Sequence, residues 1–290
     1  MRTGPGWDAS DASYAAEVAA RFDNIVPAAV TPEGRSPLDI LPAVHARSRT
    51  PTRNGGNILW LNVIADRMAG AGERVLLTGD KGNAVLSMTR PAGGLRAVAR
   101  WVLGPLRALQ PRPPRPGERF YVPAFRAAHA GVFSTYASFS GRDGFVRFAM
   151  LGQRGWGVDP MAQWGIELRD PTGDRALIEH VLRLPDAVLY PDGCSRGLAR
   201  RLGQDRVPDR VRLRRTRGEQ VPELPAIAMA HRDAYRDVLE RAAKLAPFRA
   251  IFDSTAIQAA LAQLDANDSA AAHTLTRIAD IGLFLLRETA

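Results

Sequence analysis

The chain has 290 residues, of which 46% are hydrophobic and 24% are charged, a composition that fits a folded protein and excludes a disordered one. Its single cysteine, Cys194, excludes an internal disulfide and a cysteine-built metal cage. No run reaches the ~18 consecutive apolar residues that a membrane helix needs, and the first ten residues contain no apolar signal region. We therefore expect a cytoplasmic protein without a membrane partner.

The positive charge has two interpretations. The chain carries 39 basic and 30 acidic residues, a formal net charge of +9, yet only Lys81 and Lys244 are lysines. Phosphate-tracking surfaces usually mix both basic residue types with aromatics, so we predict no nucleic-acid partner. The densest cluster, nine arginines between Arg196 and Arg217, is either a solvated charge run or a clamp for a triphosphate or pyrophosphate.

The first part of the chain alternates helical and extended patterns. Apolar residues at helical spacing after an Asp/Ser cap predict a helix over Ser10–Phe22, and the apolar run Asn24–Val30 predicts a strand. A second helix is expected from Pro37, interrupted or ended near Pro42. A further helix is expected over Ile58–Met68.

Beyond about Arg90 the pattern changes to helices and loops, with no further convincing apolar strand. Closely spaced prolines predict a stiff extended connection over Pro111–Arg119. The predicted fold class is α/β, with a partial α/β layer over residues 1–90 and a mostly helical portion over residues 91–290. The expected later helices lie in GLRAVARWVLGPLRALQ, DRALIEHVLRLP, CSRGLARRLG, PAIAMAHRDAYRDVLERAAKLA, STAIQAALAQLD and AHTLTRIADIGLFLLRE.

The strongest local feature is VLLTGDKGN, residues 75–83. Val75–Leu77 is a continuous apolar run, typical of a parallel strand buried on both faces. Thr78, Gly79 and Gly82 follow it at the carboxyl edge, where open α/β sheets bind ligands and where glycine lets a phosphate approach the backbone. The alternative is an ordinary turn, and the spacing matches neither a P-loop nor a dinucleotide fingerprint.

A second segment, Trp164–Pro185, contains acidic turn residues before a helix. Asp170 and Asp174 are expected to cap that helix, although Asp170 or Glu167 is alternatively directed into a cleft. Elsewhere the five histidines lack metal-ligand spacing, and each is expected in the core or on a helix surface. There is no GxSxG serine, so a serine hydrolase is not indicated.

In series, three segments resemble one family. TRNGGNILWLNVIADRMAGAGERVLLTGDKGNAVLS, ELRDPTGDRALIEHVLRLP and LARRLGQDRVPDRVRLRRTRGEQ resemble the synthetase half of glutamine-type asparagine synthetases, closest to relatives that close lasso-peptide macrolactam rings or form β-lactams. The resemblance runs from about Ser10 to the end of the chain. It implies a truncated parallel-sheet layer of the adenine-nucleotide alpha-hydrolase-like (PP-loop ATPase) type, with a mostly α-helical C-terminal subdomain.

The resemblance also implies a reaction, in which ATP with Mg²⁺ adenylates a small-molecule or peptide carboxylate and an amine then displaces AMP. Thr78 and Gly79 match a family Ser-Gly pair at the nucleotide, and Gly82 belongs to the same loop. Asp80 falls where the family has Glu, and Asn83 falls where it has an Asp associated with metal and phosphates.

Three further residues take implied roles. Arg217 falls where a catalytic Lys lies beside the reacting phosphate, and it supplies charge but is a poor proton donor. Asn57 lies at a loop-to-helix entry that flanks the substrate in relatives, and Asp170 is the second substrate-binding candidate. No metal ligand is assigned in this chain, and its Mg²⁺ affinity is expected to be weak.

Two family features are absent from the sequence: the SGGxDS nucleotide loop, and the amidotransferase cysteine after the initiator Met, where Arg2 stands. We therefore expect either an enzyme completed by a separate chain that carries the phosphate loop or the amidotransferase, or an inactive remnant or scaffold that binds a peptide or partner subunit. A sheet without its first strand and helix has an open edge and an uncovered apolar face, so we also expect the chain to associate.

Overall fold

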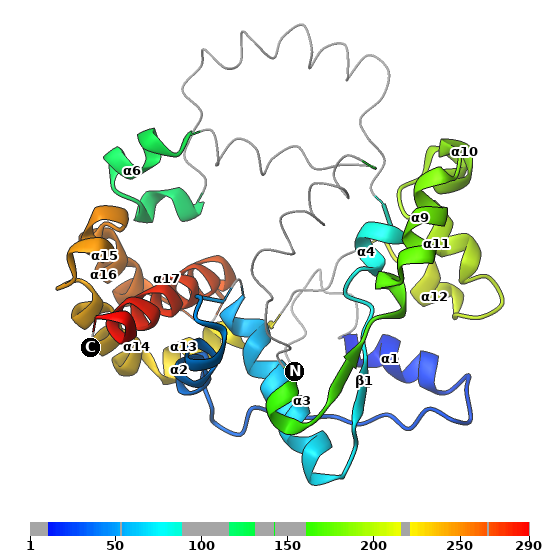
Figure 1. Ribbon diagram of the computed structural model, residues 1–290, viewed down its shortest axis with the longest axis horizontal. Helices are drawn as coiled ribbons and strands as arrows, with labels where there is room; N and C mark the ends of the chain where they lie inside the picture. Colours follow the sequence, from blue (N-terminus) through cyan, green and yellow to red (C-terminus); the bar gives the residue numbers. More distant parts are fainter. Residues whose placement is uncertain are drawn as a thin grey trace, which may run out of the picture.

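The computed structural model describes residues 11–52, 54–88, 116–130, 142, 161–215, 221–265 and 267–289. Two helical groups stand on either side of helix α3 and a two-stranded sheet (Figure 1). The elements are α1 Asp11–Ala19, α2 Pro37–Ser48, α3 Gly55–Gly70, β1 Val75–Leu77, α4 Gly82–Val85, η1 Pro116–Phe120, α6 Pro123–Ala128, η2 Ala162–Trp164, β2 Glu167–Arg169, η3 Pro171–Gly173, α9 Arg175–Arg183, α10 Asp186–Leu189, η4 Pro191–Gly193, α11 Gly197–Leu202, α12 Asp209–Arg212, α13 Leu224–Ala230, α14 Arg232–Ala242, α15 Ala246–Ile251, α16 Ser254–Gln263 and α17 Ser269–Glu288.

Helix α3 lies between the two groups because it is apolar on more than one side. It begins at Asn54, whose side chain accepts a hydrogen bond from the Asn57 amide at 3.3 Å. Leu59 on one side packs with Ile40 of α2, while Ala65 on the other packs beside the sheet. An all-round apolar helix of this kind is stable only when it is buried between other elements.

The C-terminal group of helices is built around α17. Its Leu275 is fully buried among residues of α14, α15 and η1, including Tyr235 and Phe248. Gly282 allows α17 to approach α14 closely, since a Cβ there would lie 3.0 Å from the Cβ of Ala242. Helices α2 and α13 also pack on α17, so residues before and after position 90 share one core. The predicted boundary between residues 1–90 and 91–290 stays a prediction.

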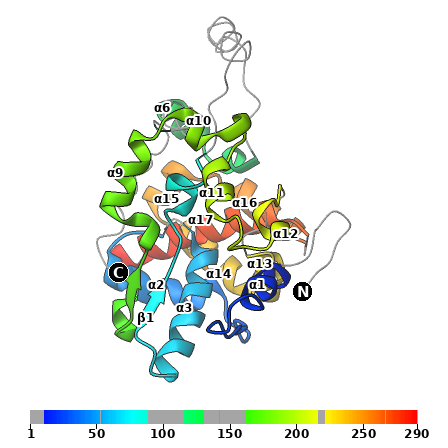
Figure 2. The ribbon, with the colours of Figure 1, turned by 90° about the vertical axis from the view of Figure 1, so that its right-hand side faces the viewer.

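The second group contains α4 and α9 to α12 (Figures 1 and 2). Val85, Val181 and Leu198 form its core. Gly197 is tightly enclosed there, because a Cβ would lie 2.2 Å from Cδ of Pro191. No helix among the residues that the structure describes is long and apolar enough to cross a membrane.

The sheet is parallel and short, with Val75 opposite Glu167, Leu76 opposite Leu168 and Leu77 opposite Arg169. Two predictions were wrong here. The apolar strand is not buried on both faces, because Val75 is 41% exposed and Leu77 is 66% exposed. A strand does follow Arg90: β2 has no apolar run that would predict it, because two of its three residues are charged and exposed. The described fold is thus mostly helical with a two-stranded parallel sheet; a PP-loop layer stays a prediction.

Two other expectations also require correction. Asn24–Val30 forms no strand but an exposed irregular segment, and Pro27 within it cannot donate to a ladder. Helix α2 does not end near Pro42 but continues to Ser48, because Leu38, Leu41 and His45 are buried and their packing outweighs the proline cost.

The other helix predictions within the described residues were confirmed, with one break. The helix expected from Pro225 to Ala246 is divided into α13 and α14 at His231. Residues 116–119 of the expected extended proline-rich connection lie in 3-10 helix η1 instead. Residues 111–115 and the helix expected in GLRAVARWVLGPLRALQ lie outside the described residues.

Candidate functional site at the carboxyl ends of β1 and β2

Two loops meet where the parallel strands end. Strand β1 leads into residues 78–83 and β2 into residues 170–174, and parallel strands place both carboxyl ends at one edge. The Thr78 amide donates to the Arg169 carbonyl at 2.8 Å, which continues the ladder beyond β1. The edge predicted from VLLTGDKGN therefore exists, and β2, which the sequence analysis missed, supplies its other half.

Asp170 ties the two loops together. Its Oδ2 accepts the Lys81 amide at 2.8 Å, and its Oδ1 accepts the amide and the hydroxyl of Thr172 at 2.9 and 2.5 Å. Burial alone would raise the pKa of the Asp170 carboxyl, but the hydrogen bonds from Thr172 and the Lys81 amide together lower it. The predicted cap is confirmed, and these oxygens are engaged within the protein rather than offered to a substrate.

The first predicted phosphate-binding residues follow β1 directly. Thr78 Oγ1 is buried and, within the described residues, has no hydrogen-bond partner. A Cβ at Gly79 would meet no described atom within 4 Å, whereas one at Gly82 would lie 3.5 Å from Thr172 Cγ2. Gly82 donates its amide to the Gly79 carbonyl at 3.0 Å and closes the turn. With respect to the described residues, the loop thus combines a hydroxyl without a hydrogen-bond partner with open space at Gly79.

The remaining predicted site residues are less closely joined. Asp80 pairs with Lys81 at 2.7 Å, and Asn83 is exposed on α4. Asn57 lies in the first turn of α3. Because α3 and β1 run in opposite directions, this first turn lies toward the same end of the molecule as the carboxyl end of β1 (Figure 1). Among the described residues, no hydrogen bond joins Asn57 to residues 78–83. Arg217 lies outside the described residues.

Glu167 is not directed into a cleft. It faces solvent on β2 and binds the Arg169 guanidinium at 2.7 Å. This hydrogen bond is the main cause of the lowered pKa of the Glu167 carboxyl. The pair is a surface feature beside the exposed side chains of β1.

The described arginines of the 196–217 cluster mostly have structural partners. Arg212 binds Asp209 at 2.7 Å and the Arg200 carbonyl at 3.3 Å. Arg210 pairs with Glu17 of α1, and the Arg210 and Arg214 guanidinium groups lie 4.7 and 4.2 Å from the ring centre of Tyr14. These contacts hold α1 on α12. Tyr14 was missed by the sequence analysis, and no local signal marks it, since its partners lie about 200 residues away along the chain.

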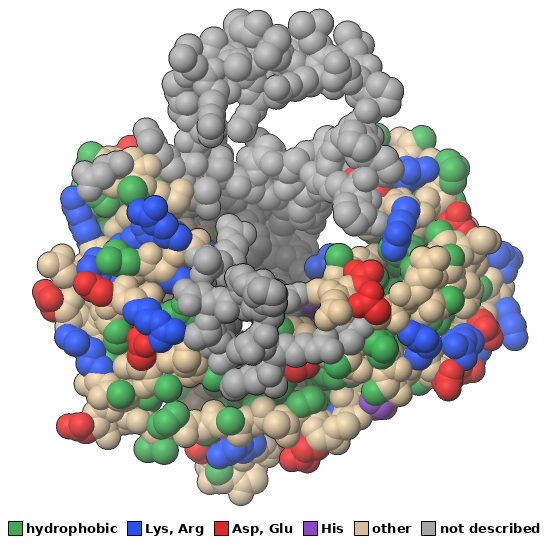
Figure 3. All heavy atoms as spheres, turned by 180° about the vertical axis from the view of Figure 1, so that it is seen from behind, with side chains coloured by type: hydrophobic (Ala, Val, Ile, Leu, Met, Phe, Trp, Pro, Cys, Tyr) green, Lys and Arg blue, Asp and Glu red, His purple; other side chains and the backbone are tan. Residues whose placement is uncertain are grey.

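Figure 3 shows acidic side chains interspersed among the basic ones on one face of the described surface. A basic stripe of the kind that follows a phosphate backbone is not visible on that face.

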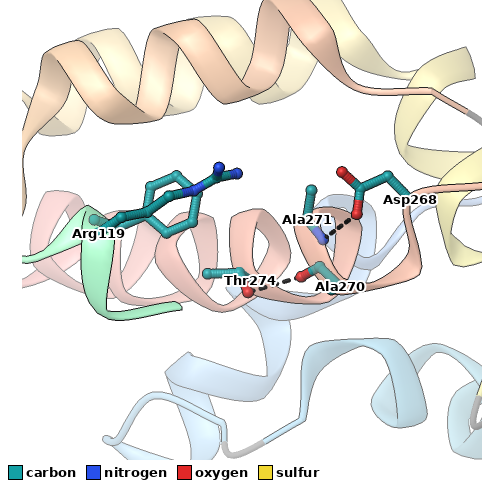
Figure 4. A pocket seen from close by; sticks show the side chains of 6 residues that line it. Arg119, Asp268, Ala270, Ala271 and Thr274 are labelled. Carbon is teal, nitrogen blue, oxygen red and sulfur yellow. Dashed lines mark hydrogen bonds between the residues drawn. The ribbon is translucent and has the colours of Figure 1, made fainter. Parts of the chain in front are cut away.

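A hollow of about 170 Å³ lies away from this edge, between η1 and the start of α17 (Figure 4). Two of its polar side chains bind within α17 and its cap: Asp268 accepts the Ala271 amide at 2.9 Å, and Thr274 donates to the Ala270 carbonyl at 2.7 Å. The Arg119 guanidinium lies 4.8 Å from the centre of the Phe120 ring. The contacts of Asp268 and Thr274 cap and stabilise the start of α17.

A buried polar cluster joins α2 to α17. His45 Nε2 lies 2.6 Å from Asp280 Oδ1, and the Thr52 hydroxyl donates to Asp280 Oδ2 at 2.7 Å. The side chains of His45 and Asp280 are fully buried, so for His45 the expected core position is confirmed. Within the described ranges, no group of three or more His, Cys, Asp or Glu residues is placed to hold a metal ion.

Comparison with protein-family models gives one match: residues 158–285 match the model described as asparagine synthase. The match includes β2, the Asp170 loop and most of α17, and it stops short of β1. No significant match was found among curated proteins or among solved structures. The resemblance stated from the sequence is confirmed for this region, whereas a relationship to lasso-peptide cyclases is not shown.

Proposed function

We propose that the chain takes part in ATP-dependent amide-bond formation, because residues 158–285 match the family model described as asparagine synthase. In this chemistry a carboxylate attacks the α-phosphorus of ATP and pyrophosphate leaves; an amine then displaces AMP and loses a proton, which gives the amide. One observation carries the proposal: Asp170, inside the matched region, binds the Lys81 amide and so holds the loop that follows β1. The loop after β1, which carries the proposed phosphate-binding residues, and the loop after β2, which lies in the matched region, are therefore joined by a hydrogen bond.

The residues present fit a phosphate group at one point. The Thr78 hydroxyl is buried without a described partner, and the space beside Gly79 is open, so a phosphate oxygen has a hydroxyl donor and a closely accessible backbone. ATP, when bound, supplies the phosphorus that the carboxylate attacks. Thr78 and Gly79 would hold the phosphates, while Asp170 keeps the loop after β1 in position through its hydrogen bond from the Lys81 amide.

The other residues take their proposed roles around this point. Asp80 and Asn83 lie on the loop and on α4, and Arg217 would add positive charge near the phosphates. Asn57 would flank the substrate. The residues fit Mg²⁺ poorly, because Asp170 is engaged in three hydrogen bonds and Asp80 is paired with Lys81. Any Mg²⁺ would be held mainly by the phosphates.

The specific reaction that we propose is asparagine formation or closure of a peptide macrolactam, with a small-molecule or peptide carboxylate as substrate. We propose that a separate chain carrying an SGGxDS loop or an amidotransferase completes the activity. We also propose that the protein is located in the cytoplasm.

The test has a binding arm and a turnover arm. Calorimetry with ATP and Mg²⁺ measures binding by the full chain, and pyrophosphate release is followed with aspartate plus ammonium or with a linear peptide, with and without a candidate partner chain. We expect Thr78→Val to weaken ATP binding roughly tenfold, as expected from losing one hydrogen bond to a charged group.

The matched control is Thr274→Val, because the Thr274 hydroxyl donates only to the Ala270 carbonyl of its own helix, in the other helical group. It should leave ATP binding unchanged. If ATP does not bind and no pairing releases pyrophosphate in response to a carboxylate, the enzymatic proposal is wrong and the scaffold alternative is supported.

A further inference from the structure

The outer edge of β1 carries backbone groups that form no hydrogen bond with any other described residue. The Arg74 carbonyl accepts from Glu167, and the Thr78 amide donates to Arg169, so residues 74, 76 and 78 face β2. Alternation along the strand directs the amides and carbonyls of Val75 and Leu77 to the other side. Within the described residues none of these four groups has a partner. Among the described residues, strand β1 is therefore an edge strand whose outer side is unpaired.

The side chains beside this edge are apolar. Val75 and Leu77 lie on one face of the strand and are 41% and 66% exposed. Leu76 points the other way, into the cluster against α3. A Val-Leu-Leu sequence is typical of a strand with neighbours and cover, not of an exposed edge.

Strand β2 has the opposite character. Its residues beside Val75 and Leu77 are Glu167 and Arg169, which pair with each other in solvent. Charged side chains of this kind protect edge strands from association. Of the two strands, β1 alone has the composition of a strand that is covered on its outer side.

We propose that the β1 edge pairs with β1 of a second copy of this chain, antiparallel and centred on Leu76. In this register Val75 of one copy is opposite Leu77 of the other, and the four free groups per strand form four inter-strand hydrogen bonds. The result is a four-stranded sheet with the apolar side chains side by side at its centre. The inference requires no nucleotide and does not rest on the proposed function.

The flanking charges are complementary in the same register. Exposed Glu73 and Arg74 precede the strand, and Asp80 and Lys81 follow it, so reversal of one copy brings an acid and a base to each end. A parallel arrangement would instead place like charges beside each other. Because the paired segment is short, the dimer is expected to be reversible, with the monomer as its dissociated form.

Cross-linking tests the register directly. Val75→Cys and Leu77→Cys are prepared as separate proteins, each with Cys194→Ser, which removes the only native thiol. Opposed residues in a hydrogen-bonded pair have Cα atoms about 5.5 Å apart, whereas identical residues would be about 8 Å apart, too far for a disulfide. Oxidation of the mixture should give the mixed disulfide dimer, and each protein alone should give little.

Sedimentation equilibrium of the unmodified chain should show a concentration-dependent dimer. Leu77→Lys should raise its dissociation constant at least about tenfold, because two apolar cross-strand pairs are lost and two like charges are added. Leu202→Lys, at another exposed leucine, should not change it. A monomer at every concentration, a dimer insensitive to Leu77→Lys, or equal cross-linking in the single-variant samples would each overturn the proposal, as would a monomer that captures another protein's strand at this edge.

Discussion

Replacement of Asp170 by Asn is the most informative change at the junction of the two loops. The carboxylate accepts three hydrogen bonds, from the Lys81 amide and from the amide and hydroxyl of Thr172. Asparagine keeps one accepting oxygen and replaces the other with an NH₂ group. If it keeps the bonds from Thr172, its NH₂ faces the Lys81 amide, and two donors are then in contact.

The magnitude follows from that loss. A hydrogen bond to a charged group contributes about 1.5–3 kcal/mol, and Asp170 is partly accessible, so water compensates in part. We expect Asp170→Asn to lower the free energy of unfolding by about 2 kcal/mol at pH 7. The amide hydrogen of Lys81 should also exchange faster with solvent, because its acceptor is gone.

The pH dependence provides a second readout. Since the pKa of Asp170 is lowered in the folded protein, its contribution is complete above the carboxyl pKa of the unfolded chain and is lost as the pH falls through the folded value. Urea unfolding at several pH values should therefore show the difference between the two proteins at pH 7 and a smaller one under acidic conditions.

The control is Asp174→Asn. Asp174 caps α9 by accepting the Leu177 amide at 2.9 Å, and asparagine caps a helix about as well as aspartate. This variant should have nearly unchanged stability and unchanged Lys81 exchange. Two results would contradict the role that we assign to the Asp170 carboxylate in holding the two loops together. One is an Asp170→Asn protein as stable as the unmodified protein at pH 7, and the other is a loss of stability that does not change with pH.

Three further changes test the packing. Gly197→Ala should cost about 1–3 kcal/mol or more in chemical unfolding because its Cβ would overlap Pro191, whereas Gly70→Ala, with no described atom within 4 Å, should be neutral or stabilising. Asp280→Ala should cost about 3–5 kcal/mol, since it leaves buried polar partners unpaired, and a small loss would contradict the buried pair. Burial raises the pKa of Tyr235 to about 12, so stability should fall as the pH rises from about 10, and Tyr235→Phe should remove that part of the fall.

Local features of the fold were predictable from the sequence where one segment contains the whole signal. The caps at Asp170 and Asp174 depend on hydrogen bonds to amides two or three residues away, and both exist. The helical spacing in α3, α9 and α17 likewise reports an apolar side that any surrounding core would bury. The locally predicted caps and helices are present in the folded protein because tertiary contacts do not oppose them.

Features that depend on distant partners were not predictable. Strand β2 exists because its backbone pairs with β1, 92 positions earlier, as the register Val75 to Glu167 shows; two of its three side chains are charged. The local sequence predicts that the helix is interrupted or ends near Pro42, but Leu41 and His45 are buried and His45 contacts Asp280 of α17, and this burial stabilises the turn that contains Pro42. In both cases the deciding energy comes from residues far away in the sequence.

The arginine cluster shows how composition alone misleads about a site. Its density is compatible with a phosphate clamp, yet a clamp needs guanidinium groups that converge on one open space. Arg210 and Arg214 instead lie over Tyr14, and Arg212 binds Asp209. At the carboxyl end of β1 the relation is reversed: a turn of ordinary appearance holds a buried hydroxyl without a described partner at Thr78. A site is therefore better identified by polar groups left unsatisfied than by charges present in excess.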